Sequence, residues 1–138
     1  MRYEWNPRLS VNNEAIDHQR KAMIRLMNDL HFAMLQGKGR EKVVRLLDDL
    51  RGISAEHFAF EESYLAEIQY PYLRWHRDRH AEFLQKMTSF ILQTESNSIG
   101  LSIDVMNYLR DWLLNHIGVE DKKYADFRAS QASTLEHA

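Results

Sequence analysis

Two pairs of side chains that commonly bind metals are spaced so that each pair shares one face of a helix. His57 and Glu61 form a His-x-x-x-Glu pair, and His76 and His80 form a His-x-x-x-His pair. Residues four apart in an α-helix are separated by roughly 40° of rotation and ~6 Å of rise, so both side chains reach toward a common point. Each pair is therefore able to hold one cation.

A third cluster, near the C-terminal end, leaves two acidic candidates. His116 is followed by Glu120 at the fourth position and by Asp121 at the fifth. A regular helix favours Glu120, because Asp121 points roughly 140° away from His116. Local unwinding near Gly118 would favour Asp121 instead. Spacing alone leaves both open.

Each cluster also has an ordinary explanation, as a histidine packed in the core or as a surface ion pair. Three such clusters on three consecutive helical segments are harder to explain in this way, because unpaired buried imidazoles and carboxylates cost free energy. The chain has no cysteine, so any metal must have nitrogen and oxygen ligands, which favours iron, manganese or zinc. Spacing does not choose among them.

The elements that must position these clusters are four long segments with apolar residues at helical steps of three, four and seven. Gly37, Gly39, Pro71 and Gly100 mark the turns between them. Helices of ~20 residues joined by short turns must run alternately up and down. We therefore predict an all-α protein, an antiparallel up-down four-helix bundle with a metal site in its core. The apolar residues that carry this periodicity include Ile16, Met23, Met27, Leu30, Val43, Leu47, Leu50, Phe60, Trp75, Phe83, Met87, Leu109, Trp112 and Ile117.

Length and charge limit the remaining possibilities. The 138 residues suit a single domain, with residues 1–12 as an N-terminal arm and residues 128–138 as a polar tail. The 18 basic and 20 acidic residues are interspersed and sum to −2, which argues against nucleic-acid binding. No apolar run resembles a signal peptide or a membrane span, so we expect a cytoplasmic protein with no membrane contact.

Taken together and in order, the motifs resemble those of the hemerythrins, the non-haem di-iron oxygen-binding proteins, and in particular the bacterial members. The resemblance covers roughly residues 5–125. It is carried by Trp5, Ile16-Asp-His-Gln19, Asn28-Asp-Leu-His31, His57-Phe-Ala-Phe-Glu-Glu62, Tyr70-Pro71, His76-x-x-x-His80, Trp112-Leu-Leu-Asn-His-Ile117, Asp121 and Tyr124.

The resemblance implies a role for each candidate residue. His76, His80 and His116 would bind one iron, and His57 would bind a second. Glu61 and Asp121 would bridge the two irons, so the family pattern favours Asp121 over Glu120. In the family, dioxygen binds at the second iron, which has fewer protein ligands, and both irons become ferric.

Residue 20 departs from the family pattern. The family has Asp-x-Gln-His at the start of the first helix, where the histidine completes the second iron's coordination, but this chain reads Asp17-His-Gln-Arg20. Arginine stays protonated and offers only donors, so it cannot be a ligand. We weigh three outcomes: solvent fills the gap in a weaker di-iron centre, Arg20 replaces the second cation over a mononuclear site, or Arg20 turns out to solvent.

The sequence thus predicts a non-enzymatic, iron-containing protein that binds dioxygen for storage, delivery or sensing. Two irons are expected from the resemblance, and one is possible because of Arg20. The alternatives are an iron enzyme that activates dioxygen or peroxide, and a mononuclear metal-binding bundle. Dioxygen is the expected small ligand, and the sequence identifies no protein partner.

Overall fold

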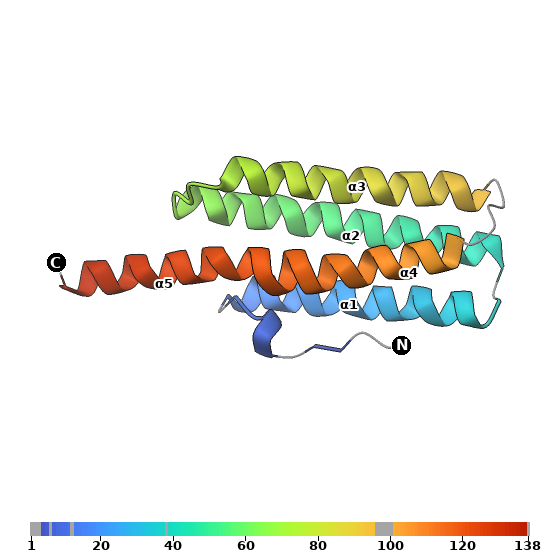
Figure 1. Ribbon diagram of the computed structural model, residues 1–138, viewed down its shortest axis with the longest axis horizontal. Helices are drawn as coiled ribbons and strands as arrows, with labels where there is room; N and C mark the ends of the chain where they lie inside the picture. The colour runs from blue at the N-terminus through green and yellow to red at the C-terminus, as the bar shows by residue number, and fades with distance from the viewer. Residues whose placement is uncertain (1–3, 6, 12, 38, 96–100, 138) are drawn as a thin grey trace.

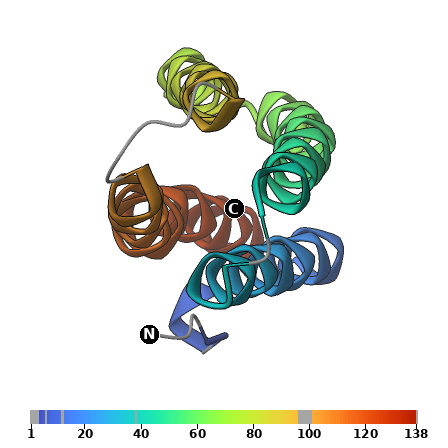
Figure 2. The ribbon, with the colours of Figure 1, turned by 90° about the vertical axis from the view of Figure 1, so that its right-hand side faces the viewer.

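The computed structural model describes residues 4–5, 7–11, 13–37, 39–95 and 101–137, and within them the chain forms four antiparallel helical rods (Figure 1). Viewed end-on, the four rods surround a common axis (Figure 2). The predicted all-α four-helix bundle is confirmed. In chain order the elements are η1 (Pro7–Leu9), α1 (Glu14–Leu35), α2 (Arg40–Glu67), α3 (Leu73–Glu95), α4 (Leu101–Asp111), η2 (Trp112–Glu120) and α5 (Asp121–His137).

The first two turns lie where glycine and proline predicted them. After α1, Gly37 and Gly39 have φ angles of 59° and 94°, a region in which a side chain would be strained. After α2, Gln69 has a φ of 58°, and the Tyr70 amide closes the turn on the Leu65 carbonyl at 2.9 Å. The third predicted turn, at residues 96–100, lies outside the described residues.

The fourth rod is one continuous helix in three parts. α4 and α5 are joined by η2, a π-helix, and α5 extends beyond the ends of the other helices (Figure 1). The segment from residue 128 to 137, which we expected to be a polar tail, is thus a continuation of α5. At the other end of the chain, the arm forms the short helix η1 before α1 begins.

The apolar core has two parts with a polar layer between them. The larger cluster includes Met23 on α1 and Phe58 on α2, and the smaller includes Ile16 and Leu65 on the same two helices. Arg20 and Glu61 lie between these residues in the sequence and are fully buried. The same order recurs on the fourth rod. A buried polar layer therefore crosses the bundle, and its members are Arg20, His57, Glu61, His76, His80, His116 and Asp121.

Two large residues of the predicted apolar faces are not in the core. Phe60 and Trp75 are each 43% exposed, and the Arg79 guanidinium carbon lies 5.7 Å from the Trp75 ring centre. Both sit at the edge of an inward helix face, where periodicity does not separate core from rim. Among the described helices, none has an apolar stretch long enough to cross a membrane.

Candidate metal centre

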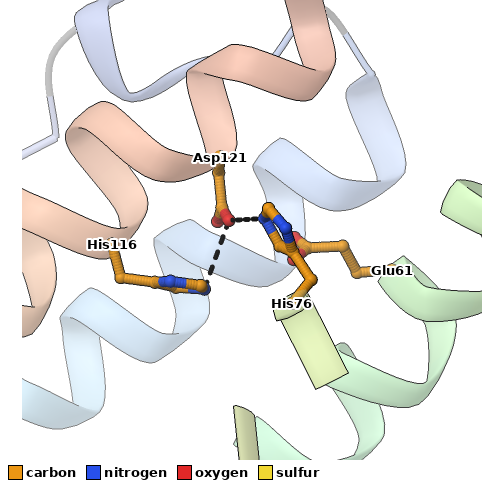
Figure 3. Close-up of side chains that lie close together, drawn as sticks. All are labelled: Glu61, His76, His116 and Asp121. Atoms are coloured by element: carbon orange, nitrogen blue, oxygen red, sulfur yellow. Dashed lines mark hydrogen bonds and ion pairs between the residues drawn. The ribbon is translucent and has the colours of Figure 1, made fainter. Parts of the chain in front are cut away.

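Four side chains from three rods converge in the middle of the polar layer. Ligand atoms of Glu61, His76, His116 and Asp121 all lie within 4.8 Å of one another, and all four residues are buried. Asp121 Oδ1 is 2.8 Å from His76 Nε2 and 3.2 Å from His116 Nε2, and the dashed lines in Figure 3 mark these two contacts. The donor set of imidazole nitrogens and carboxylate oxygens is one that suits iron.

The π-helix η2 is the reason that Asp121 reaches this cluster. The Asp121 amide donates to the carbonyl of His116, five residues earlier. This i→i+5 pattern widens the helical turn, so that residues five apart point the same way. Glu120 instead lies on the outer side, where its Oε2 accepts a hydrogen bond from His116 Nδ1 at 2.5 Å. The imidazole of His116 therefore contacts two carboxylates from the end of η2, Asp121 on the inner side and Glu120 on the outer side.

His80 and His57 face Glu61 from opposite sides. His80 Nε2 is 3.1 Å from Glu61 Oε1, while His57 Nε2 is 3.3 Å from Glu61 Oε2. His80 therefore lies on the same side of the layer as His76 and His116, whose ring centres are 5.8 Å and 5.1 Å from its own. We call these three residues the three-His side.

Three of the four histidines are anchored through Nδ1, which leaves Nε2 directed inward. His57 Nδ1 is 2.7 Å from Gln19 Oε1, and His80 Nδ1 is 3.0 Å from Glu62 Oε2. Glu120 holds His116 in the same way. Carboxylate and amide oxygens can only accept, so Nδ1 carries the proton in all three residues, and the Nε2 lone pair of a neutral ring is available to bind a metal.

Aromatic rings fix the planes of two of these imidazoles. Phe58 stacks on His80 with ring centres 4.0 Å apart and an interplanar angle of 4°. Trp112 stacks on His116 at 4.0 Å and 26°. Both aromatic residues belong to the larger apolar cluster, so apolar rings cover His80 and His116 and hold their imidazole planes in position.

The charges of the layer are strongly coupled. Burial by itself would raise the pKa of Glu61, but the imidazoles of His57 and His80 and the charge of Arg20 together hold that pKa well below its ordinary value. For His80 the effect of burial has the opposite sign and would lower the pKa. The neighbouring carboxylates of Glu61 and Glu62 outweigh burial and raise the pKa of His80 to about 9. In the absence of metal, the three-His side therefore attracts positive charge.

Arg20 lies inside the layer and is 0% exposed, so the outcome in which it turns out to solvent is wrong. Its Nη1 donates to the Leu9 carbonyl at 2.8 Å. Its Nη2 donates to Asp121 Oδ2, to Glu61 Oε2 at 3.2 Å, and to the Tyr124 hydroxyl at 3.1 Å. Tyr124 in turn donates to Glu61 Oε2 at 3.0 Å.

Buried polar atoms on the three-His side fit a metal ion. Among the described residues, Glu61 Oε1, His80 Nε2 and His116 Nε2 are buried and make no hydrogen bond. Native proteins seldom leave such atoms without a hydrogen bond. Here His80 Nε2 lies 3.1 Å from Glu61 Oε1 and His116 Nε2 lies 3.2 Å from Asp121 Oδ1. A cation bound between these atoms would offset the free-energy cost of burying them without hydrogen bonds. The residues of the three-His side therefore fit a metal ion.

Some residues that shape the site received no role from sequence reasoning. Gln19, Glu62 and Tyr124 each contact a candidate ligand. Glu62 could have been noted from the sequence, because it directly follows Glu61 on α2. Tyr124 was part of the family resemblance, but spacing could not predict its contacts with Arg20 and Glu61, which lie 104 and 63 positions away.

Comparison with known proteins agrees with this geometry. The hemerythrin HHE cation binding domain family matches residues 11–127, a span that contains every residue of the polar layer. The chain therefore belongs to the hemerythrin family.

Individual relatives support the same assignment. A bacteriohemerythrin of Stenotrophomonas maltophilia is 30% identical over 122 residues, which is 88% of this chain and 78% of that protein. A bacteriohemerythrin of Campylobacter jejuni is 25% identical over 120 residues, covering 86% of this chain and 90% of the relative. The crystal structure of a hemerythrin variant superposes with a TM-score of 0.81 at 24% identity, covering 90% of this chain and 95% of that one, and shows that the fold is shared.

Proposed function

We propose that this chain is a non-haem iron protein that binds iron at the buried polar layer and takes dioxygen as its small ligand. The observation that carries the proposal is the set of inward Nε2 atoms that face the Glu61 and Asp121 carboxylates, two of them buried without a hydrogen bond. Membership of the hemerythrin family supports both the metal and the ligand.

The residues of the polar layer and their neighbours have different roles in the proposed function. His76, His80 and His116 would bind iron through Nε2, and Glu61 and Asp121 would supply negative charge and oxygen ligands. Glu62 and Glu120 hold the imidazoles in orientation and increase their basicity. Phe58 and Trp112 keep water away from the ligand atoms. When bound, iron supplies reversible exchange between ferrous and ferric states, together with open coordination positions.

The rival function is an iron enzyme that consumes dioxygen or peroxide. The two functions predict different behaviour after a single exposure to oxygen. A binding or sensing protein takes up a fixed amount of oxygen per iron, its visible absorption changes once, and oxygen uptake then ends. An enzyme continues to consume its oxidant as long as a reductant is supplied. We expect the first behaviour, because the layer is buried and the rings of Phe58 and Trp112 cover two of its imidazoles, which restricts access by the external reductant that turnover needs.

The test starts from metal-free protein loaded with ferrous iron without oxygen and then desalted. We expect retained iron and a visible absorption change on adding oxygen, with no continued oxygen uptake in the presence of ascorbate. The control is His116→Ala, which removes one inward nitrogen and should lose iron. Wild-type protein that keeps no iron, or iron-loaded protein that does not respond to oxygen, would contradict the proposal.

A further inference from the structure

The two carboxylates of the layer each divide their oxygens between two sides. Glu61 Oε1 faces His80, while Glu61 Oε2 faces His57, Tyr124 and Arg20. Asp121 Oδ1 faces His76 and His116, while Oδ2 faces Arg20. Each carboxylate therefore offers one oxygen to a cation on the three-His side and one oxygen to a cation at the position of Arg20.

The second position is already filled by a cation. The Nη2 atom of Arg20 contacts one oxygen of each of these two carboxylates. The guanidinium carries a fixed positive charge and five donors but no lone pair for a metal. A second metal ion would have to lie beside this charge with His57 as its one remaining imidazole, and repulsion between the two cations opposes that.

The guanidinium is also held in place from outside the layer. The Leu9 carbonyl accepts from Nη1, and Leu9 ends the short helix η1 of the N-terminal arm. The arm is tied to the bundle because the Val11 amide donates to Asp17 on α1 at 3.0 Å and Lys122 on α5 donates to the Ser10 carbonyl at 3.1 Å. Displacing Arg20 would therefore disturb contacts with the arm, with α2 and with α5.

We propose that Arg20 takes the place of a second metal ion, so that the centre holds a single iron on the three-His side. This inference rests on the proposed function, since it concerns how the iron of that same layer is bound. Under it, His57 is a hydrogen-bonding neighbour of Glu61 and not a ligand. The two-iron centre implied by family resemblance is the alternative outcome of the test.

The experiment counts iron in wild-type protein and in Arg20→His after anaerobic loading with ferrous iron, desalting and elemental analysis. We expect one iron per chain in wild type and close to two in Arg20→His, since the substitution removes the charge and adds a nitrogen donor. After air oxidation, wild type should show the EPR signal of an isolated ferric ion. The loaded variant should lose much of it, because two bridged ferric ions couple.

A second comparison keeps the test decisive if Arg20→His fails to fold. His57→Ala in the wild-type background should still bind one iron, whereas His76→Ala should bind none, with circular dichroism confirming that both remain helical. Two irons in wild type would overturn the inference, as would a single iron in a folded Arg20→His variant. Absence of iron from wild type and from Arg20→His alike would instead refute the proposed function.

Discussion

The two sides of the Glu61–Asp121 carboxylate pair differ in what they offer a cation. On the three-His side, buried nitrogen and oxygen atoms face one another without hydrogen bonds. On the Arg20 side, the facing oxygens are already paired with a guanidinium and a tyrosine hydroxyl. The three-His side thus has buried polar atoms without hydrogen bonds, whereas the Arg20 side already contains the positive charge of the guanidinium.

Under our inference, Arg20 redefines one side of the site and leaves the other side intact. Each carboxylate has two oxygens, so a guanidinium that pairs with one oxygen of each leaves the other oxygen available to a cation on the three-His side. The surrounding layer stays neutralised, since a buried carboxylate pair needs nearby positive charge in either case.

Removing one imidazole from each side gives the sharpest contrast. His116 and His57 are 1% and 3% exposed, so alanine leaves a similar cavity at either position. We expect His116→Ala to lower the affinity for ferrous iron by more than about 100-fold, beyond the range for loss of an outer partner, and His57→Ala to change it little. Equilibrium titration with a ferrous chelator measures both. Equal losses would show that the two sides are not distinct.

Removing the built-in cation should destabilise the metal-free protein. Arg20→Met leaves two buried carboxylates without their shared guanidinium, and breaking such a pair costs about 3–5 kcal/mol. Urea unfolding of metal-free protein measures the change. Arg51→Met is the matched control, because Arg51 pairs with Asp48 on the surface, where an ion pair contributes about 0–1 kcal/mol. A similar small loss in both variants would mean that Arg20 does not neutralise the layer.

Outer partners should matter on one side only. Glu120→Gln removes the negative charge of the carboxylate that accepts a hydrogen bond from His116 Nδ1. Loss of such an outer partner lowers metal affinity by about 10–100-fold. Gln19→Leu removes the corresponding partner of His57 and should leave iron affinity unchanged, because His57 is not a ligand under our inference. The same chelator titration compares the two. Weaker binding in Gln19→Leu would instead indicate that His57 holds a metal.

The smallest effect is expected at Tyr124. Its hydroxyl donates to Glu61 Oε2 and accepts from Arg20, both on the Arg20 side. Tyr124→Phe removes these bonds while each partner keeps others, so we expect a loss of about 1 kcal/mol in unfolding free energy and no change in the number of irons. Urea unfolding and elemental analysis provide the two measurements. Loss of iron would show that the tyrosine supports the three-His side as well.

Much of this arrangement follows from sequence alone. Apolar residues at helical intervals predicted four helices, because burying one face of each requires a bundle. The i, i+4 spacing of His57 with Glu61 and of His76 with His80 required each pair to share a face, whatever the tertiary packing. The family resemblance added the order of the motifs, and the absence of cysteine restricted the ligands to nitrogen and oxygen.

Other features were decided only by tertiary structure. Spacing left Glu120 and Asp121 open, and Asp121 faces the layer because η2 contains an i→i+5 turn that regular helical geometry lacks. The position of Arg20 was likewise open, since a long flexible side chain can reach solvent or core equally well. Its partners Glu61 and Asp121 lie 41 and 101 positions away, and only the packing of α1 against α2 and the fourth rod brings them together. The sequence supplied the candidate ligands, and folding determined that Arg20 joins them and which groups each carboxylate oxygen faces.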